Sequence, residues 1–421
     1  MEKKGVIGIN NIYSDIKKLL YLEDTKLIDL ILAVNISRLQ RGTKLWLVIV
    51  GKSSDGKTAL LDLFDDDGFT TKTVKRITPN TLINANKNKS KTPDLAPLLD
   101  NKVVLIPEMA QILQLHPEAK AQVLAQLTDL YDGDLAMQSG TGLDIRYKDL
   151  NVSLIACSTP MIDQHTTFRN AIGTREMMYR TDDKDDDKLM DKVYENSFKD
   201  LRQVKEEIKL RIRLFLKTRK FENEEINPLI VKRIKSLAEI ITYLRATALS
   251  EQGTGELIST PSREAPTRVL HQLLTLYKSL KSIDDDYCDN KAMEIVKKVV
   301  LSSSNQMRIK VLTLLMIYNC NCDNKKGLTS RKVAKELGVS NKVVLKELEV
   351  LYLLGLLKKN ELVVSVEKEL SHYYYMIEET NKVVNMLSDE LKIPINLEVE
   401  TWNLNSQKIV VEGVKVQNTK V

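Results

Sequence analysis

The chain has 421 residues, 43% of them hydrophobic and 29% charged, which is long enough for two or three domains and typical of a folded globular protein. Its net charge of +6 permits contact with nucleic acid without requiring it, and an aromatic content of 5% disfavours a base-stacking platform for single strands. A count of four cysteines fits a reduced protein without a disulfide framework, and the sequence shows neither an apolar leader nor a stretch of membrane-spanning length, so we expect a cytoplasmic protein without a membrane partner.

The N-terminal part of the chain predicts two short helices and the first strand. Apolar side chains recur at helical spacing through residues 12–39, and Gly42 ends the second helix. The uninterrupted apolar run at 45–50 predicts a buried strand. After a turn at 65–68, the β-branched stretch 69–77 predicts a second strand, and a short helix is expected from Thr78 with Pro79 in its first turn. Residues 84–94 are expected to form a polar loop.

Two further buried strands are predicted at 102–106 and 151–157. Between them we expect a helix at 117–131 and a β-hairpin at 132–148, whose tip is formed by residues 139–142. Buried strands that alternate with helices predict an α/β fold with a mainly parallel sheet. Ligand chemistry is then expected at the carboxyl ends of the strands, where Gly51, Glu108 and Thr159 all lie.

The remainder of the sequence is predominantly helical and predicts further domains. The charged run 181–191 is interpreted as a domain boundary, and a solvated helix start explains it equally well. Residues 187–281 have a helical pattern throughout. We therefore predict an α/β domain at 1–180, a helical lid at 181–300, a winged-helix domain at 301–370 and a C-terminal extension at 371–421.

The predicted winged helix consists of a helix at 307–318, a second at 329–338, a third at 340–354 and a wing at 356–366. Thr329 is the expected N-cap of the second helix, and Gly338 its end. The third helix would present Asn341, Lys342 and Lys346 to DNA, although winged helices also serve protein contact and the pattern does not decide between the two. The Cys320-x-Cys322 pair fits either a zinc site or two buried thiols at a helix end.

The most informative motif is Gly51-Lys-Ser-Ser-Asp-Gly-Lys-Thr58, which has the spacing G-x-x-x-x-G-K-[ST] between a predicted strand and a predicted helix. Glycines at both ends let consecutive N–H groups point at phosphate oxygens, and the helix N-terminus adds its positive dipole end. Lys57 can reach the β- and γ-phosphates of ATP, and the Thr58 hydroxyl can bind Mg²⁺. The predicted nucleotide-binding residues of this loop are Gly51, Ser53, Ser54, Asp55, Gly56, Lys57, Thr58 and Ala59.

By the order of these motifs, residues 12–370 resemble the AAA+ ATPases of the MCM-like helicase branch, in particular the short versions carried by phages and mobile elements. The resemblance implies a P-loop AAA+ sandwich followed by an all-α lid and a winged helix. It makes Lys57 and Thr58 the Walker A pair and Glu108 the acidic Walker B residue, which would hold Mg²⁺, polarise the attacking water, or do both. Pro107 stands where the family usually has Asp, so slow hydrolysis is one expectation.

The same resemblance assigns further roles around the expected ATP site. Thr159 corresponds to the polar sensor, for which the family more often has Asn. Arg175 corresponds to the arginine finger that reaches the nucleotide of a neighbouring subunit, with Arg180 as the alternative. Arg268 corresponds to the second sensor arginine in a lid helix. A finger that acts in trans implies a homo-oligomeric ring, most often a hexamer.

The hairpin at 132–148 lies where MCM-like proteins carry a pore-facing hairpin. Those hairpins usually have a lysine at the tip and this one does not, so Arg146 and Lys148 are the candidates for contact with DNA phosphates. The polar loop 84–94 is short for the hairpin that such proteins insert at this place. The chain also has no counterpart of the N-terminal oligonucleotide-binding and zinc domain of full MCM proteins, which makes strand separation less certain than ATPase activity.

Three functions follow from the sequence. The first is a ring-forming, Mg²⁺-dependent ATP hydrolase that acts on single-stranded or forked DNA as a replicative helicase-like motor, in contact with replication proteins. The second is an ATP-dependent initiator or loader that remodels a replication partner without unwinding. The third is a winged-helix DNA-binding switch that binds ATP and barely hydrolyses it. Translocation polarity, ring size and the role of residues 371–421 are not given by the sequence.

Overall fold

The chain folds into two compact units, Met1–Ile226 with His271–Val299, and Asn227–Leu270 with Val300–Val421. The computed structural model describes residues 7–66, 68–84, 93–138, 144–164, 174–182, 184–249, 251, 257–321, 327–363 and 370–376. The four-domain division expected from the sequence stays a prediction. Among the described helices, none is both long enough and apolar enough to cross a membrane.

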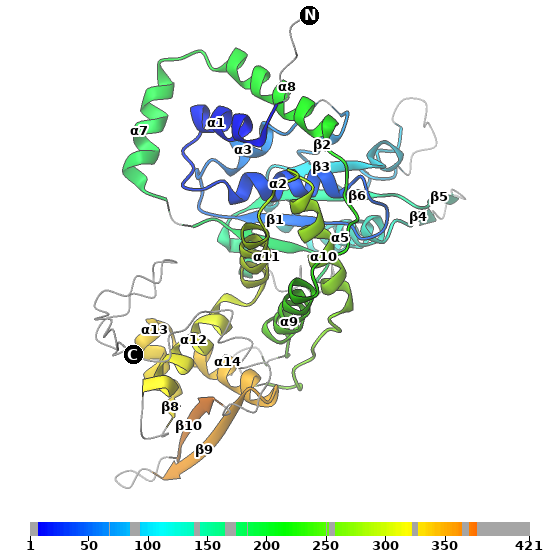
Figure 1. Ribbon diagram of the computed structural model, residues 1–421. Helices are drawn as coiled ribbons and strands as arrows, with labels where there is room; N and C mark the ends of the chain where they lie inside the picture. Colours follow the sequence, from blue (N-terminus) through cyan, green and yellow to red (C-terminus); the bar gives the residue numbers. More distant parts are fainter. Residues whose placement is uncertain are drawn as a thin grey trace, which may run out of the picture. The chain divides into compact units, whose positions relative to one another are not determined.

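The first unit is built on a five-stranded sheet with the order β2-β3-β6-β1-β7 (Figure 1). Its strands are β1 (Trp46–Val50), β2 (Thr71–Thr73), β3 (Lys102–Ile106), β6 (Val152–Ser158) and β7 (Met177–Arg180). Every pairing is parallel. This confirms the predicted α/β class with a parallel sheet. The AAA+ and winged-helix assignments stay predictions.

Helices cover both faces of the sheet, which explains why its central strands β1 and β6 are buried throughout. Successive side chains of β6 point to opposite faces of the sheet and therefore pack against two different layers of helices. Leu154 and Ala156 belong to the core formed with α4 (Ala110–Leu113), α5 (Pro117–Asp132) and the 3₁₀ turn η1 (Ala96–Leu99). Ser153 points to the opposite face, where its hydroxyl lies 3.4 Å from that of Ser37 at the end of α2 (Lys26–Ser37). A second 3₁₀ turn, η2 (Pro160–Gln164), follows β6.

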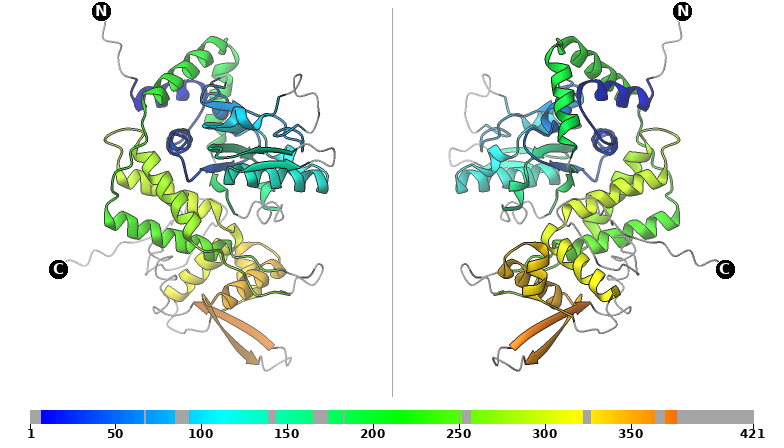
Figure 2. Two further views of the ribbon diagram at one scale, coloured as in Figure 1. Left: turned by 90° about the vertical axis from the view of Figure 1, so that its right-hand side faces the viewer. Right: turned by 90° about the vertical axis from the view of Figure 1, so that its left-hand side faces the viewer.

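Further helices surround this sandwich (Figure 2). They are α1 (Ile9–Leu19), α3 (Lys57–Asp62), α7 (Asp186–Ser197), α8 (Arg202–Thr218), α10 (Thr267–Lys281) and α11 (Asp289–Ser303). A buried polar cluster joins α2 to α11 and to the segment before it. The fully buried Asp29 carboxylate accepts a hydrogen bond from Tyr287 at 2.8 Å and lies 2.7 Å from Lys291 Nζ. The buried carboxylate thus has a hydrogen-bond donor and a positive charge beside it.

Two local predictions near the second strand were wrong. β2 spans three residues instead of the predicted 69–77, because Thr70 and Thr71 bind the Asp66 carboxylate and shape the chain into a turn before the strand begins. The helix expected from Thr78 is a single turn in which the Thr81 N–H bonds to the Thr78 carbonyl at 3.0 Å. The Thr81 hydroxyl also accepts a hydrogen bond from the Thr78 N–H at 2.8 Å, and bonds of this kind between side chain and backbone compete with helix formation.

The predicted hairpin is confirmed as β4 (Leu135–Gln138) and β5 (Asp144–Tyr147), which pair antiparallel. Its tip, Ser139 to Gly142, lies outside the described residues. Most of the polar loop 84–94 also lies outside them. Its two ends are joined by a 2.8 Å hydrogen bond from the Asn84 N–H to the Asp94 carboxylate.

The second unit contains α9 (Pro228–Arg245), α12 (Gln306–Asn321), β8 (Leu328–Thr329), α13 (Ser330–Leu337), α14 (Asn341–Leu353), β9 (Leu357–Val363) and β10 (Leu370–Met376). The three strands form one antiparallel sheet in the order β8-β10-β9. The wing expected at 356–366 is therefore a longer ribbon that continues to residue 376. The predicted N-cap is confirmed, because the Thr329 side chain accepts a hydrogen bond from the Lys332 N–H.

A buried ion pair fixes α12 against α14. Arg308 Nε donates to Glu347 at 2.8 Å, and Arg308 Nη1 donates to the carbonyls of Tyr243 and Ala246 at the end of α9. The thiols of Cys320 and Cys322 lie outside the described residues. Within the part of the chain that the structure describes, no group of three or more His, Cys, Asp or Glu side chains could hold a metal ion.

Candidate functional site

The predicted phosphate loop lies at the carboxyl edge of the sheet, between β1 and α3. Gly56 has a φ of +78° and Ser54 a φ of +62°, so the chain turns sharply before α3 begins at Lys57. Gly51 is closely surrounded: a Cβ atom there would lie 2.1 Å from the Thr181 hydroxyl and 2.9 Å from an Asp55 oxygen. The glycine at the start of the motif is therefore required by its protein neighbours.

Lys57 is turned into the loop. Its ammonium group donates to the Gly51 carbonyl at 2.9 Å and to the Lys52 carbonyl, and the residue is 9% exposed. The pKa of Lys57 is lowered because the ammonium group is buried, although the nearby Asp55 carboxylate offsets part of this effect. A phosphate that enters the loop would replace two neutral carbonyls by an anion as the partner of this ammonium group, which favours binding. Ser53, Ser54, Thr58 and Ala59 are exposed on the same loop and first helical turn.

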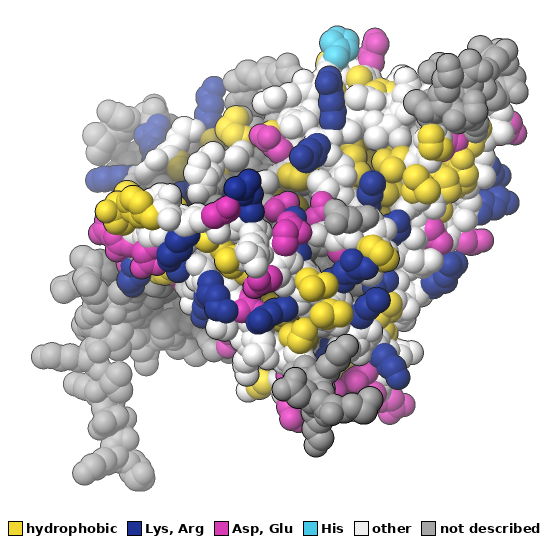
Figure 3. Space-filling view, turned by 90° about the horizontal axis from the view of Figure 1, so that it is seen from above, with side chains coloured by type: hydrophobic (Ala, Val, Ile, Leu, Met, Phe, Trp, Pro, Cys, Tyr) yellow, Lys and Arg dark blue, Asp and Glu magenta, His cyan; other side chains and the backbone are white. Residues whose placement is uncertain are grey.

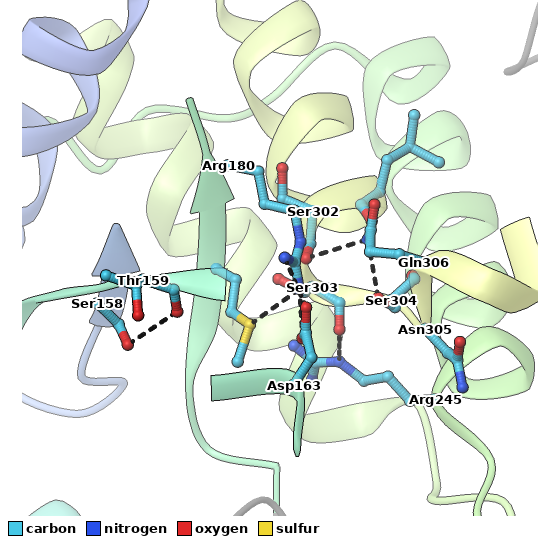
Figure 4. Close-up of polar contacts among 12 residues, drawn as sticks. Ser158, Thr159, Asp163, Arg180, Arg245, Ser302, Ser303, Ser304, Asn305 and Gln306 are labelled. Atoms are coloured by element: carbon cyan, nitrogen blue, oxygen red, sulfur yellow. Dashed lines mark hydrogen bonds and ion pairs between the residues drawn. The ribbon is translucent and has the colours of Figure 1, made fainter. Parts of the chain in front are cut away.

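The structure brings the loop and the Glu108 segment together. The Thr58 hydroxyl donates to the Pro107 carbonyl at 3.3 Å, and the neighbouring Glu108 side chain is exposed. β6 lies between β1 and β3 in the sheet, so its end stands between the loop and Glu108. The Gly51 N–H bonds to the Ser158 carbonyl at 3.2 Å, and Thr159 follows directly (Figure 4). The predicted loop, acid and polar sensor thus share one edge of the sheet.

A pocket that is open to solvent lies beside the loop on the α3 side. Sequence reasoning missed it, because its walls come from three segments far apart in the chain. Its apolar side chains are Leu22, Leu27, Leu60 and Tyr179, and its polar ones include Glu23, Asp24, Asp182 and Lys184. An apolar hollow with a few polar groups next to a phosphate loop suits the base and sugar of a nucleotide.

The two candidate finger arginines lie at opposite edges of the sheet. Arg180 ends β7 beside Val50, at the loop edge, and forms two hydrogen bonds of 2.9 and 2.6 Å with Asp163 (Figure 4). Arg175 lies before β7, five residues ahead of Arg180, and five residues of extended chain span about 16 Å. An arginine side chain does not span that distance, so Arg175 does not reach the loop of its own chain.

Arg175 is held by side chains of its own unit. Its Nε and Nη2 donate to the Asp132 carboxylate at 3.2 and 2.7 Å, and its guanidinium group lies 5.6 Å from the Tyr131 ring centre. Its carbonyl accepts a 2.7 Å hydrogen bond from the buried Gln272 amide. These contacts fix the residue at the amino edge of the sheet.

The remaining predicted residues are distributed over the two units. Arg268 is half-buried in the first turn of α10, and its sensor role stays a prediction. On α14, Lys342 is exposed and Lys346 half-buried one turn later, in a helix that also exposes Val343, Leu345 and Tyr352. A face of this kind mixes basic and apolar groups, and it does not decide between DNA and protein as its partner.

The hairpin residues proposed for DNA lie on the first unit. Arg146 on β5 is paired with Asp134, with a 2.9 Å bond from its Nε, and Lys148 is exposed just beyond the strand. Figure 3 shows Lys and Arg side chains interspersed with Asp and Glu over one face of the molecule. On the described part of that face, the positive charge is not gathered into a patch of one sign.

Comparisons with known proteins give little beyond this geometry. Neither a protein-family model nor a curated protein matches the chain. Among solved structures, the A form apo structure of the NrS-1 C-terminal region is 11% identical, with a TM-score of 0.32 over 87% of this chain and 75% of that one. A second structure, of NrS-1 region 305–718, is 12% identical, with a TM-score of 0.31 over 86% and 74%. Both scores lie below 0.5, and neither fold nor function is inferred from them.

Proposed function

We propose that this protein is a Mg²⁺-dependent ATP hydrolase of the AAA+ type that assembles into a ring and acts on DNA as a helicase-like motor. The observation that carries the proposal is the shared edge of the sheet. There the loop with Lys57, the Glu108 segment and Thr159 converge, and the apolar pocket adjoins them. A triphosphate in the loop would have its γ-phosphate directed towards Glu108 and Thr159, where hydrolysis needs a positioned water.

The residues at this edge suit the chemistry of phosphoryl transfer. Lys57 would leave the two loop carbonyls and neutralise charge on the β- and γ-phosphates. Glu108 would accept a hydrogen bond from the attacking water, and Thr159 would orient that water or the γ-phosphate. The Thr58 hydroxyl and the Glu108 carboxylate are oxygen donors of the kind that Mg²⁺ prefers, and they belong to segments joined by the bond from Thr58 to Pro107. Bound Mg²⁺ would supply positive charge to the phosphate oxygens.

Assembly would complete the site. Because Arg175 lies at the edge opposite its own loop, it can stabilise the transferred phosphoryl group only in a neighbouring chain. A head-to-tail arrangement that places one chain's amino edge on the next chain's loop edge either closes into a ring or continues as a filament. We favour a hexameric ring, in line with the resemblance of the motifs. Arg146, Lys148, Lys342 and Lys346 are the proposed DNA contacts.

The alternative of a nucleotide switch with little hydrolysis is supported by one residue, Pro107. It directly precedes Glu108, at the position where the motifs that this chain resembles usually have Asp. Glu108 alone would then have to serve both Mg²⁺ and water. A chain built in this way binds ATP and turns it over slowly. A loader that remodels a protein partner is the remaining alternative.

The proposal is tested by ATP hydrolysis in mixtures of two inactive variants. Lys57→Ala lacks the loop lysine and Arg175→Ala lacks the finger, so each should be inactive alone. Where a Lys57→Ala subunit places its intact finger against the intact loop of an Arg175→Ala subunit, the site is complete. Mixing the two variants should therefore restore a substantial part of the activity. Arg202→Ala is the matched control, since Arg202 is also paired with a carboxylate, that of Asp200, and its side chain is exposed.

Three outcomes separate the possibilities. Restored activity that rises with protein concentration and with single-stranded DNA supports the shared site. Activity of Arg175→Ala equal to wild type rules out the finger. ATP binding without turnover at any concentration favours the switch or the loader.

A further inference from the structure

A buried carboxylate stands inside the loop that is proposed to receive a polyanion. Asp55 is 8% exposed and directly precedes Gly56, and it faces the same space as Lys57. A negative charge at this place opposes phosphate binding, and an unpaired buried carboxylate is costly in itself. The loop therefore needs a compensating group close to Asp55.

That group comes from the segment after β7, more than 120 residues away in the sequence. Lys184 Nζ lies 2.9 Å from Asp55 Oδ1 and donates to the Asp55 carbonyl at 2.6 Å. The Thr181 hydroxyl donates to Asp55 Oδ2 at 2.9 Å. Both oxygens of the carboxylate are thus bound, and the Lys184 side chain is only 13% exposed.

The segment that carries these groups is itself anchored to the sheet. The Thr181 N–H bonds to the Val50 carbonyl at 2.9 Å, directly before the loop, which continues the pairing of β7 with β1. Lys184 and Thr181 therefore hold the middle of the loop against a fixed strand. The Asp55 carboxylate raises the pKa of Lys57, and the Lys184 ammonium group lowers it. The three side chains therefore form one electrostatic cluster beside the loop.

We propose that Lys184 is a positioning residue for nucleotide binding: it neutralises Asp55 and holds that carboxylate away from the phosphates, so that the loop accepts a triphosphate. This rests on the proposed function of the loop. Lys184 acts through Asp55 and need not touch the phosphates. It follows that its removal should be harmful only while Asp55 carries its charge.

The test is a double-mutant cycle on the full chain, with N-methylanthraniloyl-ATP and Mg²⁺ as the fluorescent probe. Lys184→Met keeps the length of the side chain and removes the charge, and it should weaken binding by roughly ten-fold or more, since the carboxylate is left unpaired beside the phosphates. Asp55→Asn combined with Lys184→Met should restore binding to within a few-fold of wild type. Lys192→Met is the matched control, because Lys192 forms an ion pair with Glu195 on α7, away from the loop.

Thermal unfolding without nucleotide gives a second measurement. Lys184→Met should lower the melting temperature, and the added Asp55→Asn should recover most of the loss, because an unpaired buried charge is replaced by a neutral amide. If wild type binds the probe but the double variant binds as weakly as Lys184→Met, Lys184 contacts the nucleotide itself and the proposal is overturned. Equal binding by wild type and Lys184→Met also overturns it. If wild type binds no probe, the proposed function fails as well.

Discussion

Replacing Gly51 by alanine should disturb the loop through a contact that belongs to the fold rather than to a ligand. The added Cβ would lie 2.1 Å from the Thr181 hydroxyl, far inside van der Waals distance. That hydroxyl is bound to the Asp55 carboxylate at 2.9 Å and lies 3.4 Å from the Val50 carbonyl, so it can move away only by giving up both contacts.

The magnitude follows from those two contacts. A hydrogen bond to a charged group contributes about 1.5–3 kcal/mol and a neutral one about 0.5–1.5 kcal/mol, which gives a cost of roughly 2–4 kcal/mol for Gly51→Ala. At about 2–4 °C per kcal/mol for a unit of this size, we expect the melting temperature to fall by roughly 4–16 °C. Differential scanning calorimetry measures the shift.

A second variant makes the reasoning refutable. Thr181→Ala loses the same hydrogen bonds but removes the clashing oxygen. Gly51→Ala should therefore cost much less in the Thr181→Ala background than in wild type, with a remainder from the 2.9 Å approach to Asp55. If the two substitutions are additive, or if Gly51→Ala melts with wild type, the close contact does not determine the loop.

Three further predictions concern the stability of the two units, each measured by urea unfolding. Gly133→Ala should cost about 2 kcal/mol or more, because Gly133 ends α5 with a φ of +88° and an added Cβ would lie 2.8 Å from the Leu150 carbonyl oxygen; a cost under 0.5 kcal/mol would contradict this. Glu347→Ala should destabilise the second unit by roughly 3 kcal/mol, since it leaves Arg308 charged and buried, and a neutral effect would show that water replaces the lost partner. Burial raises the pKa of Asp66, but hydrogen bonds to its carboxylate outweigh that effect, and the pKa is lowered. The loss of stability in Asp66→Ala should therefore be largest above about pH 4 and should shrink as the pH falls further. A loss that is independent of pH would refute this.

The phosphate loop could be predicted from the sequence because its determinants are local. Strand, glycines, lysine and helix follow one another within 16 residues, and the structure has them as β1, the loop and α3. The convergence of Glu108 and Thr159 on the same edge was also predictable, because parallel strands present their carboxyl ends together.

The partners of Asp55 were not predictable in this way. Thr181 and Lys184 reach the loop only because β7 lies beside β1, and a strand order with long crossovers cannot be read from periodicity. In the sequence these residues belong to a charged run that was interpreted as a domain boundary or a solvated helix start. α7 does begin there, capped by the Asp185 side chain. The available signal was position: the run directly follows a buried strand, at the edge where the loop lies.

The short second strand shows a different limit. Residues 69–77 are β-branched and favour a strand, yet Asp66 collects the N–H groups and hydroxyls of Thr70 and Thr71, and only three residues remain paired. Local hydrogen bonds of a buried carboxylate outweighed the propensity of the segment.

The most direct test of the central claim is equilibrium binding of Mg²⁺–ATP to the purified full chain, compared with Lys57→Ala, by isothermal titration calorimetry. We expect saturable binding with one site per chain, lost or weakened at least 100-fold in Lys57→Ala, because the variant leaves the phosphates without their buried ammonium partner. Binding that is absent in wild type, or equal in the two proteins, would show that the loop at the end of β1 is not a nucleotide site.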